Sequence, residues 1–119
     1  MTLGKAPFPR VNRLKRASSF RALLKNARSV RQRGAVLYYL EKNSSEENRL
    51  GVMVAKRVLR HATERNRVKR IVREFFRLNQ KNFQGKFDLV IRLVENHNLL
   101  GKNELQELLH QLFKRAGIV

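Results

Sequence analysis

The residues of this chain with the clearest chemistry are the lysines and arginines between positions 49 and 77. Ten residues of this stretch are basic, and only Glu64 and Glu74 are acidic. A solvated charged face normally mixes both signs. The excess of guanidinium and ammonium groups therefore predicts binding to an anionic partner, most simply through phosphates.

The stretch from Arg60 to Arg77 has the period of an amphipathic helix. At about 100° per residue, one face collects the apolar residues Val68, Ile71, Val72 and Phe75. The opposite face collects Asn66, Lys69, Arg70, Arg73 and Arg77. One face of the predicted helix would therefore pack on a core while the other meets anions.

Side chains suited to catalysis or metal binding are sparse. His61, His97 and His110 are isolated, and no pair has the spacing and acidic partner of a zinc site. The paired glutamates fall in a predicted turn (Glu46-Glu47) or on a solvated helix face (Glu104 and Glu107), and Asp88 opens a strand. The chain has no cysteine, which excludes a disulfide framework and a thiol nucleophile. We predict neither a catalytic residue nor a metal site in the protein itself.

The composition of the 119 residues also favours a polyanionic partner. Lys and Arg number 27 against 9 Asp and Glu, a formal net charge of +18. Solubility alone needs about 2 to 8 charges in a small domain. A membrane is the poorer candidate, because no stretch approaches the roughly 20 apolar residues of a span. No apolar run of signal-peptide length opens the sequence, and we expect a cytoplasmic protein.

The length predicts one domain, residues 1–119, and we expect its first sixteen residues to form an extended basic segment. Pro7 and Pro9 disfavour a helix there, and the nearby charges are Arg13, Lys15 and Arg16. Ser18 or Ser19 could cap a short helix that ends near residue 27 or 28.

Two strands are predicted next, at residues 35–40 and about 49–56, separated by a polar turn. On the first of them Val36, Tyr38 and Leu40 share a face. We expect the two strands to pair as an antiparallel hairpin.

The second half reads strand, helix, strand, helix, which predicts a layered α/β sandwich. Its last strand, at residues 87–94, alternates Phe87, Leu89, Ile91 and Leu93 against Asp88, Val90, Arg92 and Val94. The final helix has Asn103 as a possible N-cap and apolar positions at Leu105, Leu108, Leu109, Leu112 and Phe113.

Two roles stay open from the residues alone. Asn66 could contact a base edge or a 2′-hydroxyl, or it could cap a turn near the helix start. Phe8, Phe20 and Tyr38 could belong to the core, which position favours, or stack on unpaired bases.

The segment Arg65-Asn66-Arg67-Val68-Lys69-Arg70, preceded by Gly51-Val52-Met53-Val54-Ala55-Lys56-Arg57, resembles the signature of the bacterial ribonuclease P protein subunits. The resemblance extends in order over nearly the whole chain. It includes Arg13-Leu14, Phe20 in the first helix, Val36-Leu37-Tyr38, an Asp88-led strand and a Leu-rich final helix.

The resemblance implies an α+β two-layer sandwich with a mixed sheet, like the second domain of ribosomal protein S5. The basic helix would sit in a left-handed βαβ crossover, against the usual right-handed preference.

The family's activity implies a function for this chain. It would be the protein subunit of an endoribonuclease that removes the 5′ leader of precursor tRNA. A large RNA would carry the catalysis with Mg²⁺, and the protein would bind that RNA and the single-stranded leader. No tightly bound cofactor and no protein oligomer is expected.

The implied contacts fall into three groups. The catalytic RNA would meet the basic helix through Arg60, Arg65, Asn66, Arg67, Lys69, Arg70, Arg73 and Arg77. The leader would lie in a central cleft formed by Phe20, Leu24, Val36, Tyr38, Lys56 and Arg57. Arg13, Lys15 and Arg16 would add charge at the N-terminus.

Two positions depart from the family pattern. Leu24 replaces an aromatic residue of some members, which favours apolar contact over stacking there. Arg92-Leu93-Val94 lacks the basic residue with which relatives often end this strand.

Two other classes of protein fit parts of the sequence. A structural ribosomal or RNA-chaperone protein could share the charge and a related fold. A nuclease acting alone would need acidic metal ligands, which are not apparent here.

Overall fold

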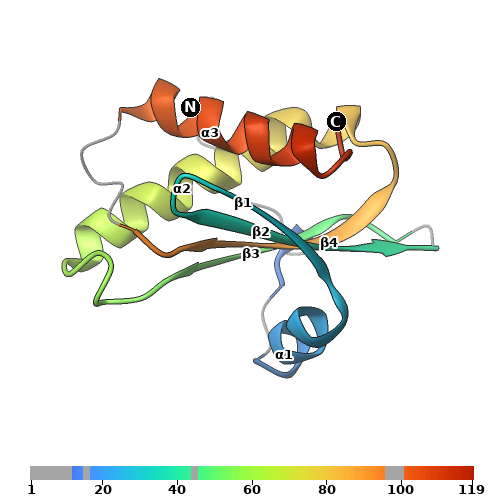
Figure 1. The fold of residues 1–119 in the computed structure, drawn as a ribbon, viewed down its shortest axis with the longest axis horizontal. Helices are drawn as coiled ribbons and strands as arrows, with labels where there is room; N and C mark the ends of the chain where they lie inside the picture. The colour runs from blue at the N-terminus through green and yellow to red at the C-terminus, as the bar shows by residue number, and fades with distance from the viewer. Residues whose placement is uncertain (1–11, 15–16, 44–45, 96–100) are drawn as a thin grey trace, which may run out of the picture.

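The computed structural model describes residues 12–14, 17–43, 46–95 and 101–119. Its elements are α1 (Ala17–Asn26), β1 (Arg28–Gln32), β2 (Ala35–Lys42), β3 (Arg49–Val54), α2 (Ala62–Asn79), the 3-10 helix η3 (Gln80–Asn82), β4 (Lys86–Leu93) and α3 (Lys102–Arg115). The strands form one mixed sheet in the order β1-β2-β4-β3. Figure 1 shows α2 and α3 on one face of this sheet and α1 on the other. The predicted two-layer sandwich with a mixed sheet is confirmed.

The predicted hairpin between residues 35–40 and 49–56 is wrong. β4 lies between β2 and β3, antiparallel to β2 and parallel to β3. β4 is buried at most positions, and only the centre of a sheet buries both faces of a strand. α2 therefore connects two parallel neighbours, β3 and β4; the left hand of this crossover stays a prediction.

The hairpin partner of β2 is β1, a strand that the sequence did not suggest. β1 reads Arg-Ser-Val-Arg-Gln and is a largely exposed edge strand. A two-residue turn at Arg33 and Gly34, both with positive φ, joins it to β2. Positive φ at both central residues is the backbone of the tight turns that match the twist of a hairpin.

The main core lies between the sheet and the pair α2 and α3. α2 contributes Val68, Ile71, Val72, Phe75 and Phe76, and α3 contributes Leu105, Leu108, Leu109, Leu112 and Phe113. They meet Leu37, Leu89, Ile91 and Leu93 of the sheet. The apolar faces predicted for both helices and for the last strand are confirmed.

A smaller apolar cluster joins α1 to the opposite face of the sheet. Leu14, Leu23 and Val90 are its buried residues, and Phe20 and Tyr38 pack against them partly exposed. α1 is thus attached to the sheet through a small cluster, in which Tyr38, Leu40 and Met53 of the sheet stay partly exposed.

The predicted helix starts need correction. α1 begins at Ala17, so Ser18 and Ser19 lie inside its first turn. α3 is capped at Gly101, whose amide donates to Glu104 Oε1 at 2.9 Å, and Asn103 lies within the helix.

No helix in the described part of the chain is long and apolar enough to cross a membrane.

Candidate RNA-binding surface

The basic face of α2 points away from the core, as predicted. Asn66 and Arg70 are exposed, and Arg67, Lys69, Arg73 and Arg77 are half-buried. Because these residues alternate with the buried stripe at Val68, Ile71 and Val72, the packing of α2 fixes the direction of its cations. We name this set, together with Arg60 and Arg65, the α2 surface.

Both acidic residues of α2 are engaged within the protein. Glu64 Oε1 accepts the backbone N–H of His61, the N-cap residue, at 3.2 Å. Glu74 lies 2.7 Å from Lys102 Nζ at the start of α3. Their charges stabilise the helix start and the α2–α3 contact.

The N-cap of α2 is His61. Asn66 lies within the helix, so the capping role considered for Asn66 is wrong.

Arg65 links α2 to the loop before it. Its Nη1 donates to the carbonyl oxygens of Leu59 at 2.9 Å and Arg60 at 3.0 Å. Leu59 is fully buried and anchors the loop, while Lys56, Arg57 and Arg60 are exposed on it. Arg65 therefore has a structural role that the sequence did not reveal.

Arg73 lies near another cation. Partial burial lowers its pKa below the ordinary arginine value, and the nearby charge of Arg13 lowers it further. Arg13 belongs to a short segment that bridges to Leu50 of β3. The N-terminal segment and α2 thus bring like charges together, which a phosphate between them would stabilise.

The second surface is the face of the sheet beside α1, and strand register arranges it in rows. Ser29, Tyr38, Val90 and Gly51 form one row, and Arg31, Val36, Arg92 and Met53 form the next. Phe20 and Leu24 of α1 lie against this face. We name Phe20, Leu24, Val36, Tyr38 and Met53, with Arg92, the α1-side surface.

One end of this face is closed by an ionic cluster. Asp88 accepts two hydrogen bonds from Arg49, at 2.9 and 2.8 Å, and lies 3.1 Å from Lys42 Nζ. Burial alone would raise the pKa of Asp88, but the hydrogen bonds from Arg49 and Lys42 outweigh it and hold that pKa below its ordinary value. Asp88 therefore has a structural role as the shared partner of Arg49 and Lys42.

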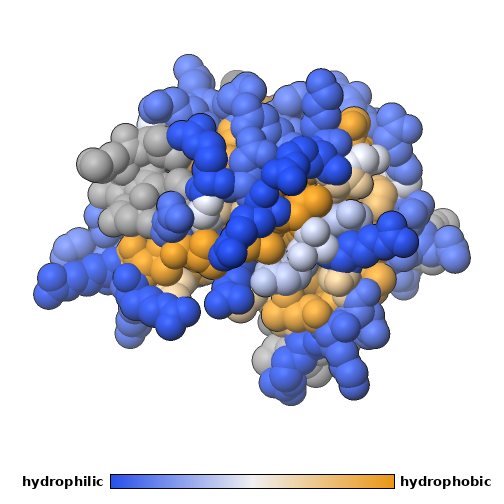
Figure 2. Space-filling model, viewed as in Figure 1, coloured by the Kyte–Doolittle hydropathy of each residue, from blue (hydrophilic) through white to orange (hydrophobic). Residues whose placement is uncertain are grey.

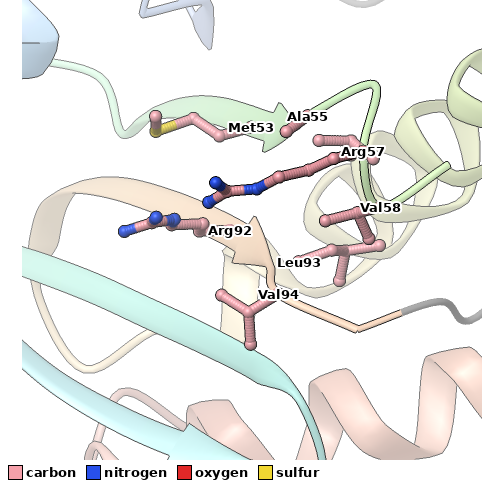
Figure 3. A pocket seen from close by; sticks show the side chains of 8 residues that line it. Met53, Ala55, Arg57, Val58, Arg92, Leu93 and Val94 are labelled. Carbon is pink, nitrogen blue, oxygen red and sulfur yellow. The ribbon is translucent and has the colours of Figure 1, made fainter. Parts of the chain in front are cut away.

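The other end of this face opens into a cavity of about 320 Å³. It is lined by Met53, Val54, Ala55, Arg57, Val58, Arg92, Leu93 and Val94. Figure 3 shows the Arg57 and Arg92 side chains extending the same way over the strand ends. Arg57 thus lies beside Met53 and Arg92 of the α1-side surface, whereas Lys56 does not line this cavity.

The two surfaces lie on opposite faces of the sheet (Figure 1). In Figure 2 hydrophilic side chains dominate the outline, and apolar ones show at the level of the sheet and beside α1. Phe8, Lys15, Arg16 and His97 lie outside the described residues. Among the described residues, no three His, Cys, Asp or Glu side chains gather in a way that could hold a metal ion.

Comparison with known proteins identifies the family. The Ribonuclease P family model matches residues 8–117. A ribonuclease P protein component of Desulforapulum autotrophicum is 34% identical over 113 residues, which is 95% of each chain. One of Clostridium botulinum is 37% identical over 108 residues, 90% of this chain and 96% of that one.

Solved structures agree with the sequence relatives. The Staphylococcus aureus RNase P protein superposes with a TM-score of 0.82 at 25% identity, over 90% of this chain and 96% of that chain. The Thermotoga maritima RNase P protein gives a TM-score of 0.76 at 28% identity, over 87% of this chain and 96% of that chain. This chain shares the fold of these two proteins, and it belongs to the ribonuclease P protein family.

Proposed function

We propose that this protein binds the catalytic RNA of ribonuclease P and the 5′ leader of precursor tRNA, and so assists removal of the leader. The observation that supports this most is the presence of two different RNA-compatible surfaces on opposite faces of one sheet. One surface is a helix face rich in cations, and the other combines partly exposed aromatic and apolar groups with arginines.

The α2 surface suits the folded catalytic RNA. Most of its cations come from successive turns of one helix, and both acids of that helix are engaged within the protein. Such a surface recognises closely spaced phosphates and releases their condensed counterions. Arg13, close to Arg73, would extend the contact to the N-terminal segment.

The α1-side surface suits a single strand. Phe20 and Tyr38 present partly exposed rings beside apolar side chains, and stacking on such rings tolerates any base sequence. This is the property that a protein needs when many precursor tRNAs carry different leaders. The protein would position the substrate, while the RNA subunit would bind the Mg²⁺ that drives hydrolysis.

Binding of leaders of increasing length tests the proposal. Holoenzyme reconstituted from this chain and its cognate catalytic RNA should bind precursor tRNA more tightly than mature tRNA. The difference should grow over the first few leader nucleotides and then level off. An RNA subunit alone that shows the same gain would place the leader contact outside the protein.

A further inference from the structure

We propose that Arg57 and Arg92 together form a phosphodiester site at the open end of the α1-side surface, and that it holds the backbone of the single-stranded leader. The proposal rests on the leader-binding function proposed above and adds Arg92 to the residues that perform it. No family pattern points to Arg92, because relatives often place their basic residue at the end of this strand.

Arg92 is a charged residue at a position of the sheet that has apolar neighbours on both sides. Its cross-strand neighbours are Val36 on β2 and Met53 on β3, both apolar, and the next inward residue on this face of β4 is the fully buried Val90. An aliphatic side chain would pack well between these two neighbours in the middle of a sheet. The guanidinium therefore has no evident role in packing.

Arg92 also differs in its ion pairing from a structural arginine such as Arg49. Within the part of the chain that the structure describes, Arg57 and Arg92 form no ion pair, whereas Arg49 at the other end of the same face is held by Asp88. No acidic residue lines the cavity that they share. Two guanidinium groups facing one cavity without a carboxylate match the charge and geometry of a phosphate.

The surroundings select a nucleic-acid backbone over a free anion. Tyr38 and Phe20 lie in the adjoining part of the same face, one row of residues inward, which is about 7 Å along a strand. A base could stack there while its phosphate meets the two arginines, whose side chains Figure 3 shows. The site would therefore be selective for an extended single strand.

The test combines Arg92→Leu with leaders that carry a single neutral methylphosphonate linkage. Leucine fits between Val36 and Met53, so the variant should fold, with a thermal midpoint no lower than that of the native chain. In reconstituted holoenzyme it should weaken precursor binding about tenfold, the loss expected for one charge-assisted contact, and leave mature tRNA binding unchanged. At one leader position, the methylphosphonate linkage should weaken the binding of the precursor to native holoenzyme by a similar factor. At that same position it should not weaken binding to the Arg92→Leu holoenzyme any further.

Lys114→Leu is the matched control, because it removes one cation from the exposed end of α3 on the other side of the sheet. It should leave both affinities unchanged. If native holoenzyme prefers the precursor but Arg92→Leu keeps that preference, or if the two losses add at every leader position, the phosphate site is wrong while leader binding stands. If native holoenzyme shows no preference for the precursor, leader binding itself is wrong.

Discussion

Gly51 of β3 leaves room for the ring of Phe20 on α1. A Cβ atom built at Gly51 would lie 2.4 Å from Phe20 Cζ and 2.6 Å from its Cε1. Real Cβ atoms do not approach other carbons so closely, so any other residue at this position would displace the ring. The absence of a side chain at Gly51 of β3 thus leaves the space that the Phe20 ring of α1 occupies.

Gly51→Ala should therefore destabilise the protein by about 1–3 kcal/mol, the usual cost of overpacking. Urea unfolding of the native chain, Gly51→Ala, Phe20→Ala and the double variant measures this. In the Phe20→Ala background the added methyl has space, and most of its cost should disappear. An equal cost in both backgrounds would show that the glycine is required by the backbone and not by the ring.

Asp88→Asn should lower the free energy of unfolding at neutral pH by about 1–3 kcal/mol, because it removes the charge that Arg49 and Lys42 share. The folded pKa of Asp88 lies below its ordinary value of 3.8, which approximates the unfolded state. The carboxylate therefore stabilises the fold above pH 3.8, and this contribution is lost as the pH falls through the folded pKa.

Unfolding measured from pH 7 to pH 2 tests this linkage. The difference between the native chain and Asp88→Asn should be constant above about pH 5 and should shrink below pH 3.8. A difference that grows on acidification would contradict the ionic role of Asp88.

Arg70→Ala should weaken binding to the catalytic RNA, and the slope of log affinity against log salt should fall by about one. Arg70 is exposed on α2, so the folded state should keep its stability. Arg65→Ala should weaken binding too, and it should also destabilise the loop whose carbonyl groups Arg65 holds. A salt titration of RNA binding by both variants separates a phosphate contact from a role in holding the loop. An unchanged slope for Arg70→Ala would show that Arg70 does not contact a phosphate of the RNA.

Tyr38→Ala should weaken precursor tRNA binding more than mature tRNA binding, by about 1–3 kcal/mol for the loss of one stacked base. Tyr38→Phe keeps the ring and should retain most of the preference. Equal losses for the two RNAs would reject a leader contact for this residue.

The sequence predicted the elements whose pattern is local. α2, α3 and β4 have periodic apolar residues over eight or more positions, and each was placed to within a few residues. Strand pairing was predicted wrongly, because β2 and β4 meet across more than forty residues and no local pattern records that contact. The sequence does not predict β1, because its exposed edge position removes the apolar alternation that identifies a strand.

The candidate site was predictable in part for the same reason. The cations of α2 follow from helical period, and the shared face of Val36 and Tyr38 follows from alternation. Alternation along the strand predicts that Arg92 shares a face with Val90, yet only the register shows that it lies between Val36 and Met53. The bonds of Arg65 to the loop and the room that Gly51 leaves for Phe20 depend on tertiary contacts, which sequence spacing cannot show.

Cleavage of precursor tRNA by the cognate catalytic RNA, with and without this protein at low Mg²⁺, tests the central claim most directly. The account predicts that cleavage at the 5′ end of the mature tRNA requires the protein at low Mg²⁺ and that the protein alone cleaves nothing. Equal cleavage with and without the protein would favour a structural ribosomal or RNA-chaperone role. Cleavage by the protein in the absence of the RNA would contradict the assignment of catalysis to the RNA.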